Sequence, residues 1–143
     1  MALTLNQIVK KITDYGNQHA QINFVLYGDV YDHLSQGEVT YPAMFFNLDS
    51  CQILAKEIQY TFGIYFMDRQ IETTEELEVM SDQLLTAQDI IAQIRNNDNE
   101  WKVSDSIPMT LFVESEPDVL AGVKADITLT LTSLNNRCQI PLI

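Results

Sequence analysis

Two histidines are the side chains of this sequence best suited to acid–base catalysis near neutral pH. His19 and His33 each lie in a polar, loop-like stretch, and neither has a partner carboxylate at a spacing diagnostic of a catalytic pair. A histidine in a loop is usually solvated, so catalysis is the less favoured interpretation of both residues. An enzyme that uses His33 with a nearby acid is therefore the weakest of three functional hypotheses for this chain.

A pair of carboxylates is the second arrangement that would support chemistry. Asp68 and Asp89 lie on either side of a predicted junction between a strand and a helix, where they would form a paired-carboxylate site. Asp89, however, follows Asp82 by seven residues and so shares its face of the helix. A solvated acidic stripe explains these residues without a metal, and we favour that interpretation.

Other chemical motifs are missing from the sequence. Cys51 and Cys138 are too few for a disulfide framework, and no CxxC or Cys/His spacing indicates a metal site. No GxSxG, GxGxxG, Walker A or HExxH motif occurs, and the chain has only 5 glycines. We interpret both cysteines as reduced thiols of an intracellular protein. We predict no catalytic residue, no cofactor and no metal, and hence that the chain is not an enzyme.

Acidic residues dominate the charge. The chain has 143 residues, 20 acids and 8 bases, for a formal net charge of −12. Residues 68–118 alone hold thirteen acids against three bases. This field repels phosphate, so sequence-specific DNA reading and binding to an anionic membrane are both disfavoured. An acidic surface could still line a passage through which DNA slides, although a solvated helix face that keeps the protein soluble is the simpler reading.

A strand followed by a long helix forms the centre of the predicted fold. In residues 57–68 the apolar side chains alternate, which places five of them on one buried face of a strand. Thr73 and Glu76 form a capping box for a helix that continues to Arg95. The predicted apolar stripe of this helix, at spacings of three and four, consists of Leu77, Met80, Leu84, Ala87, Ile90, Ile91 and Ile94.

The rest of the chain extends this plan into an α+β fold. A first helix is capped by Thr4 and Gln7 and is expected to stop at Gly16. Further strands are predicted at residues 21–27, 39–48 and 123–132, with a strand or extended arm at 107–114 and a polar loop at 30–38. The order is α-β-β-β-α-β-β in a single domain spanning 1–143, with a short C-terminal arm (134–143). Short connections favour a mostly antiparallel sheet, with helices packed on one face.

The two clearest strands, 57–68 and 123–132, are long for a domain of this size. Their ends should project beyond the core and seek a partner, which a ring of identical subunits would supply. The strands could instead be shorter or bulged, and the sequence alone does not decide between these alternatives.

Several stretches of the chain resemble neck and tail-completion proteins of tailed bacteriophages. They are Tyr-Gly-Asp-Val-Tyr-Asp at 27–32, Val-Thr-Tyr-Pro-Ala-Met-Phe at 39–45, Phe-Gly-Ile-Tyr-Phe-Met-Asp-Arg at 62–69 and Glu-Val-Met-Ser-Asp-Gln-Leu at 78–84. The similarity is greatest to tail-terminator-like ring proteins of crAss-like and other Bacteroidetes phages. It covers most of the chain and carries no catalytic residues.

The resemblance implies a structural virion protein in a homo-oligomeric ring of six or twelve subunits, at the head–tail neck or tail end. DNA would pass through it without specific binding, and neighbouring neck, portal-side or tail proteins would be its partners. Assembly would take place in the cytoplasm of the host bacterium, with no membrane involved. Candidate subunit contacts are Tyr31, His33, Tyr65, Met67, Ile140, Leu142 and Ile143. The alternative is a small intracellular binding or adaptor module that uses the loop at 30–38.

Overall fold

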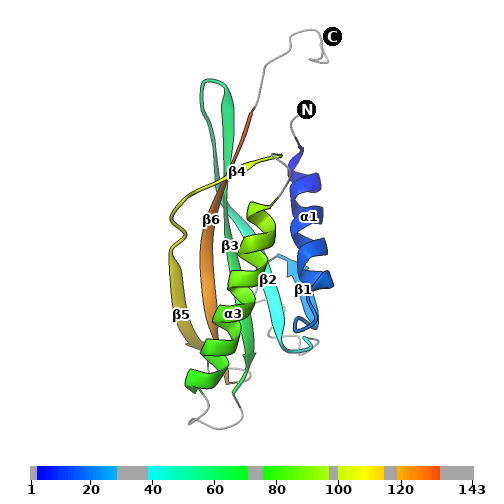
Figure 1. Ribbon diagram of the computed structural model, residues 1–143, viewed down its shortest axis with the longest axis vertical. Coiled ribbons are helices and arrows are strands. Elements are labelled where there is room, and N and C mark those ends of the chain that lie inside the picture. Colours follow the sequence, from blue (N-terminus) through cyan, green and yellow to red (C-terminus); the bar gives the residue numbers. More distant parts are fainter. Residues whose placement is uncertain (1–2, 29–38, 71–75, 97–99, 115–118, 133–143) are drawn as a thin grey trace.

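The computed structural model describes residues 3–28, 39–70, 76–96, 100–114 and 119–132 (Figure 1). Within these residues the chain forms an α+β fold, as predicted, with one more strand than expected. The elements are α1 (Leu5–Gln18), β1 (Phe24–Tyr27), β2 (Ala43–Ile53), β3 (Glu57–Arg69), α3 (Glu76–Arg95), β4 (Lys102–Val103), β5 (Met109–Glu114) and β6 (Leu120–Thr132). The additional strand is the two-residue β4.

The strands form one six-stranded mixed sheet. Its order is β1-β2-β3-β6-β4, and β5 also pairs with β6. Every pairing is antiparallel except that of β1 with β2, which is parallel. The expectation that consecutive strands pair antiparallel is therefore wrong for β1 and β2. Residues 28–42 connect them, and a connection of this length can make the crossover that a parallel pair needs.

The centre of the sheet is the pair β3 and β6, which are each 13 residues long and pair from Glu57↔Thr132 to Arg69↔Leu120. The predicted buried face of β3 is confirmed, because Tyr60, Phe62 and Phe66 belong to the main hydrophobic cluster. Both helices pack on this face and complete the cluster. Its helical members are Ile8, Ile12, Ala87, Ile90 and Ile94.

The opposite face of the sheet carries a second, smaller cluster. Phe45, Met67 and Leu120 are buried there, with Tyr65 and Phe112 packed against them. Farther along the same face the side chains are polar, and Thr61 Oγ1 lies 3.2 Å from Thr128 Oγ1. One solvent-exposed face was predicted for β6. From Lys124 onward, buried side chains alternate along the strand with more exposed ones, as that prediction requires.

Helix α1 begins as predicted but ends later. Thr4 accepts a hydrogen bond from the Gln7 backbone N–H, and the Gln7 side chain accepts one from the Thr4 N–H, which makes the expected capping box. Gly16 does not stop the helix, which continues to Gln18. A Cβ at position 16 would lie 2.8 Å from Val25 Cγ2 and 2.9 Å from Met44 Sδ. The glycine therefore lets the helix approach the sheet closely.

Helix α3 buries the predicted stripe from Ala87 to Ile94, whereas in its first half Met80 and Leu84 are only half-buried and the buried face is shifted. Leu77 is 79% exposed, whereas Gln83 and Thr86 are buried with Ala87 and Ile90. Spacings of three and four fit two neighbouring stripes of this helix, and packing against the sheet and α1 selects the stripe that contains Gln83. The proposed capping residue Thr73 lies outside the described residues.

The hairpin of β2 and β3 extends past the ends of both helices, together with the end of β6 (Figure 1). The strands are thus long, and β2 also contains an irregularity in register between Leu48 and Ser50. Pro42, which has no N–H to donate to a strand pairing, directly precedes β2.

Candidate functional site

His19 joins the two helices. It caps the C-terminal end of α1, where its Nδ1 accepts a hydrogen bond of 3.1 Å from the Gln21 backbone N–H. Because Nδ1 accepts, Nε2 is the protonated ring nitrogen, and its N–H donates a hydrogen bond of 2.9 Å to Asp89 Oδ2 on α3. The residues are 70 positions apart, so sequence spacing could not reveal the pair. The geometry of the His19–Asp89 pair fits a contact between helices. Among the described residues, no second acid and no nucleophile is seen to contact the pair.

The two carboxylates considered as a pair have different neighbours. Asp89 contacts His19, whereas Asp68 lies near Asp82. Burial raises the pKa of Asp68 from its usual value, and the charge of Asp82 raises it further. A hydrogen bond of 2.7 Å from the Arg69 backbone N–H opposes this shift. Asp68 is thus a partly buried single carboxylate at the end of β3, and the structure does not bring Asp68 and Asp89 together.

Metal ligands do not gather in the described part of the chain: no group of three or more His, Cys, Asp or Glu residues there could hold an ion. Cys51 on β2 is an exposed free thiol. His33 and Cys138 lie outside the described residues.

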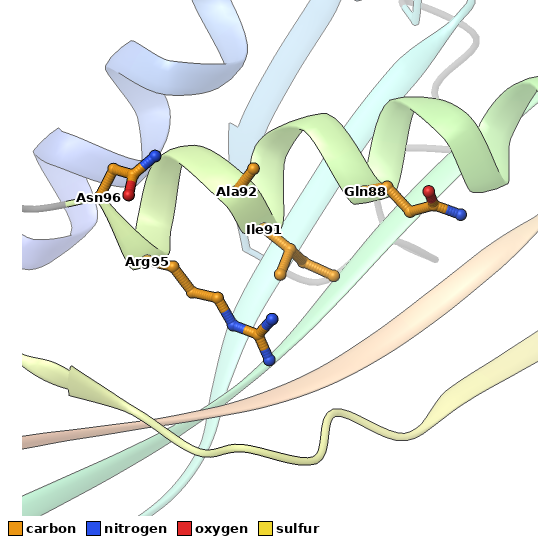
Figure 2. A pocket seen from close by; sticks show the side chains of 5 residues that line it. All are labelled: Gln88, Ile91, Ala92, Arg95 and Asn96. Atoms are coloured by element: carbon orange, nitrogen blue, oxygen red, sulfur yellow. The ribbon is translucent and has the colours of Figure 1, made fainter.

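A shallow hollow lies beside the second half of α3 and is lined by Gln88, Ile91, Ala92, Arg95 and Asn96 (Figure 2). Arg95 points across it toward the segment between β4 and β5, and its Nη2 donates to the Ser104 and Asp105 carbonyl oxygens at 3.4 and 3.1 Å. These bonds fasten the edge of the sheet to the helix. The lining contains no nucleophile and no carboxylate, so it offers no acid–base chemistry.

Exposed apolar side chains are the clearest functional feature of the surface. Pairs of them occur in three places: Ile53 and Leu54 at the end of the β2–β3 hairpin, Leu77 and Leu85 on α3, and Leu111 and Val113 on β5. Tyr27 and Val119 are exposed singly. Clustered apolar exposure is typical of surfaces that contact other proteins. We therefore treat these three places as candidate contact surfaces.

The predicted subunit contacts have a mixed outcome. Met67 is 1% exposed and packs in the second cluster, so this side chain belongs to the subunit's own core and the prediction that it contacts a neighbour is corrected. Tyr65 is half-buried, with its ring 5.9 Å from that of Phe112 and Lys124 Nζ 5.5 Å from its centre. The other five candidates lie outside the described residues: Tyr31, His33, Ile140, Leu142 and Ile143.

Comparison with known proteins finds no matching family model and no curated protein of similar sequence. Neither helix in the described ranges is both long and apolar enough to span a membrane.

Proposed function

We propose that this chain is a structural virion protein of a tailed bacteriophage, one subunit of a ring at the head–tail neck or tail end through which DNA passes. The observation that carries the proposal is the projecting β2–β3 hairpin, whose end exposes Ile53 and Leu54 far from the core of the subunit. A lone domain gains nothing from such an extension, because its apolar side chains stay in water. A subunit that contacts neighbours on two sides gains an interface.

The distribution of charge supports passage of DNA without binding. Helix α3 exposes Glu76, Glu78, Asp82 and Asp89 along its length and carries one base, Arg95, in its last turn. On the polar face of the sheet, Lys124 lies 3.4 Å from Asp126 and 3.9 Å from Asp49, so its charge is partly neutralised. Neither surface offers a cluster of bases that would hold phosphate.

The sequence resemblance to tail-terminator-like ring proteins supports the same proposal independently of the surface. The described residues also offer no catalytic constellation that a competing enzymatic role would use. The pair of His19 and Asp89 joins helix to helix, and the hydrogen bond from Arg95 to Asp105 joins helix to sheet edge. A structural role accounts for these features together.

The direct test is the mass of the purified full-length protein by multi-angle light scattering, followed by electron microscopy, alone and with connector proteins of the same virion. We expect rings of six or twelve copies, or their formation on the connector. A strict monomer that binds no connector would refute the proposal. Capture of some other partner that is lost when Tyr31 and His33 are replaced by alanine would support the adaptor module instead.

A further inference from the structure

We infer that the hairpin tip of one copy docks on the outer face of α3 of a second copy. The hairpin tip is defined as Ile53, Leu54 and Lys56, and the outer face of α3 as Leu77, Glu78, Ser81, Asp82 and Leu85. This inference rests on the proposed ring and assigns the two surfaces through which neighbouring subunits meet.

The hairpin tip is a defined apolar projection. Ile53 is 78% exposed, and Leu54 beside it is also exposed. The Leu54 N–H donates a hydrogen bond of 2.8 Å to the Glu57 carbonyl oxygen, which closes the turn. Lys56 is exposed in the same turn, so the tip presents two apolar side chains and one cation. Glu57, which follows it, is also exposed, but it begins β3 and lines a hollow with Lys102 and Thr132.

The outer face of α3 offers the matching chemistry. Leu77, Ser81 and Leu85 follow one another at intervals of four residues, and Leu77 and Leu85 are 79% and 58% exposed. Glu78 and Asp82 run beside them, and a shallow hollow is lined by Leu77, Glu78, Ser81 and Asp82. An apolar strip with two carboxylates at its side suits an apolar ligand that carries one positive charge.

We take the occupant to be a second copy, because the two surfaces are complementary in charge and cannot meet within one copy. Strand β3 runs from the hairpin tip to the end of the sheet where α3 begins, and its 13 residues span about 40 Å. The tip and the first turns of α3 in one copy therefore lie at opposite ends of the sheet (Figure 1). Because the two surfaces differ, the contact is head-to-tail, and repetition of such a contact closes a ring when the rotation allows it.

The exposed side chains of β5 are a poorer match for the tip. Leu111 and Val113 are apolar, but β5 has a single carboxylate, Glu114 at its last residue, whereas Glu78 and Asp82 both lie beside the leucines of α3. This difference makes β5 a matched control for the outer face of α3.

Cysteine cross-linking tests the contact in a chain whose own thiols are removed by Cys51→Ser and Cys138→Ser. Leu54→Cys and Leu77→Cys are made in separate chains and mixed under mild oxidation. We expect a disulfide-linked dimer from the mixture, and none from Leu54→Cys alone or from Leu54→Cys mixed with Leu111→Cys. A dimer from Leu54→Cys alone, or linkage to Leu111→Cys in preference to Leu77→Cys, would overturn the inference.

A charge reversal provides the second readout. Lys56→Glu should raise the protein concentration needed for half-assembly by about tenfold or more, since like charges would then face each other. Glu78→Lys in the same chain should restore assembly, and both positions are exposed, so far-ultraviolet circular dichroism should show an unchanged fold.

The two proposals fail in different ways. Rings that form normally with Lys56→Glu and give no Leu54–Leu77 cross-link would refute only the assigned surfaces. A wild-type chain that stays monomeric with and without connector proteins would refute the ring itself.

Discussion

Replacing Gly122 with alanine is expected to destabilise the fold strongly. Gly122 lies in β6, where it pairs with Met67 of β3 on one side and Phe112 of β5 on the other. A Cβ added there would overlap the Phe66 carbonyl oxygen and lie 3.0 Å from Met67 Cα. These obstacles are backbone atoms of a strand paired along its whole length, so they cannot move aside without breaking the ladder.

The size of the effect follows from two opposing terms. Overpacking a well-filled site lowers the free energy of unfolding by about 1–3 kcal/mol or more. Replacing glycine also restricts the unfolded chain, which raises the free energy of unfolding by about 0.4–1 kcal/mol. Because the collision here is with backbone, we take the upper part of the range and expect a net loss of at least about 2 kcal/mol. For a chain of this size that corresponds to a fall in Tm of about 6 °C.

Urea unfolding followed by the fluorescence of the single tryptophan, Trp101, measures this loss. The matched control is Gly63→Ala in the neighbouring strand β3. Its added Cβ would meet Asp49 Oδ2 at 2.8 Å and Lys124 Cε at 2.9 Å, both at the ends of side chains that can rotate away. We expect a change within about 1 kcal/mol. Wild-type stability of the Gly122→Ala protein, or an equal loss in both variants, would refute the reasoning.

Three further substitutions test the helix face, the carboxylate and the tryptophan. Ile90→Ala should lower the free energy of unfolding by about 3 kcal/mol, because the side chain is fully buried, whereas Leu77→Ala should change it by less than about 0.5 kcal/mol; urea titration compares them. The raised pKa of Asp68 means that the folded protein binds a proton at this carboxyl more tightly than the unfolded chain does. The contribution of Asp68 to stability is therefore full below the pKa of the unfolded chain and falls as pH rises through the pKa of the folded protein. Asp68→Asn should remove that fall and be at least as stable as wild type at pH 7, as urea titrations at several pH values would show. Trp101→Phe removes the 2.7 Å hydrogen bond from Nε1 to the Ile94 carbonyl oxygen and should cost about 1–3 kcal/mol, measured by circular dichroism.

The strands that sequence predicted best are those with one buried face. In β3 and β6, apolar residues alternate with polar ones over ten or more positions, and only one register buries the whole set. The edge strands carry less information. β1 has four residues, and its parallel pairing with β2 depends on the path of a long connection rather than on its own side chains.

Contacts distant in sequence were beyond prediction. The pair of His19 and Asp89 exists because α1 and α3 lie side by side on the sheet, and no local spacing encodes that arrangement. The role of Gly16 was misread for the same reason, since a glycine near a helix end is typical of a stop signal and here serves a close approach to Val25.

The error in the predicted face of α3 bears on function. Gln83 precedes Ala87, Ile90 and Ile94 by four, seven and eleven residues, so the stripe that packs on the sheet includes this amide. The same packing leaves Leu77 and Leu85 directed outward. Gln83 is accordingly 3% exposed. Covering the outward leucines with another apolar surface would be favourable. The hairpin tip is an apolar surface of this chain that its own α3 cannot reach, so the proposed contact between copies would cover the tip and the outward leucines together.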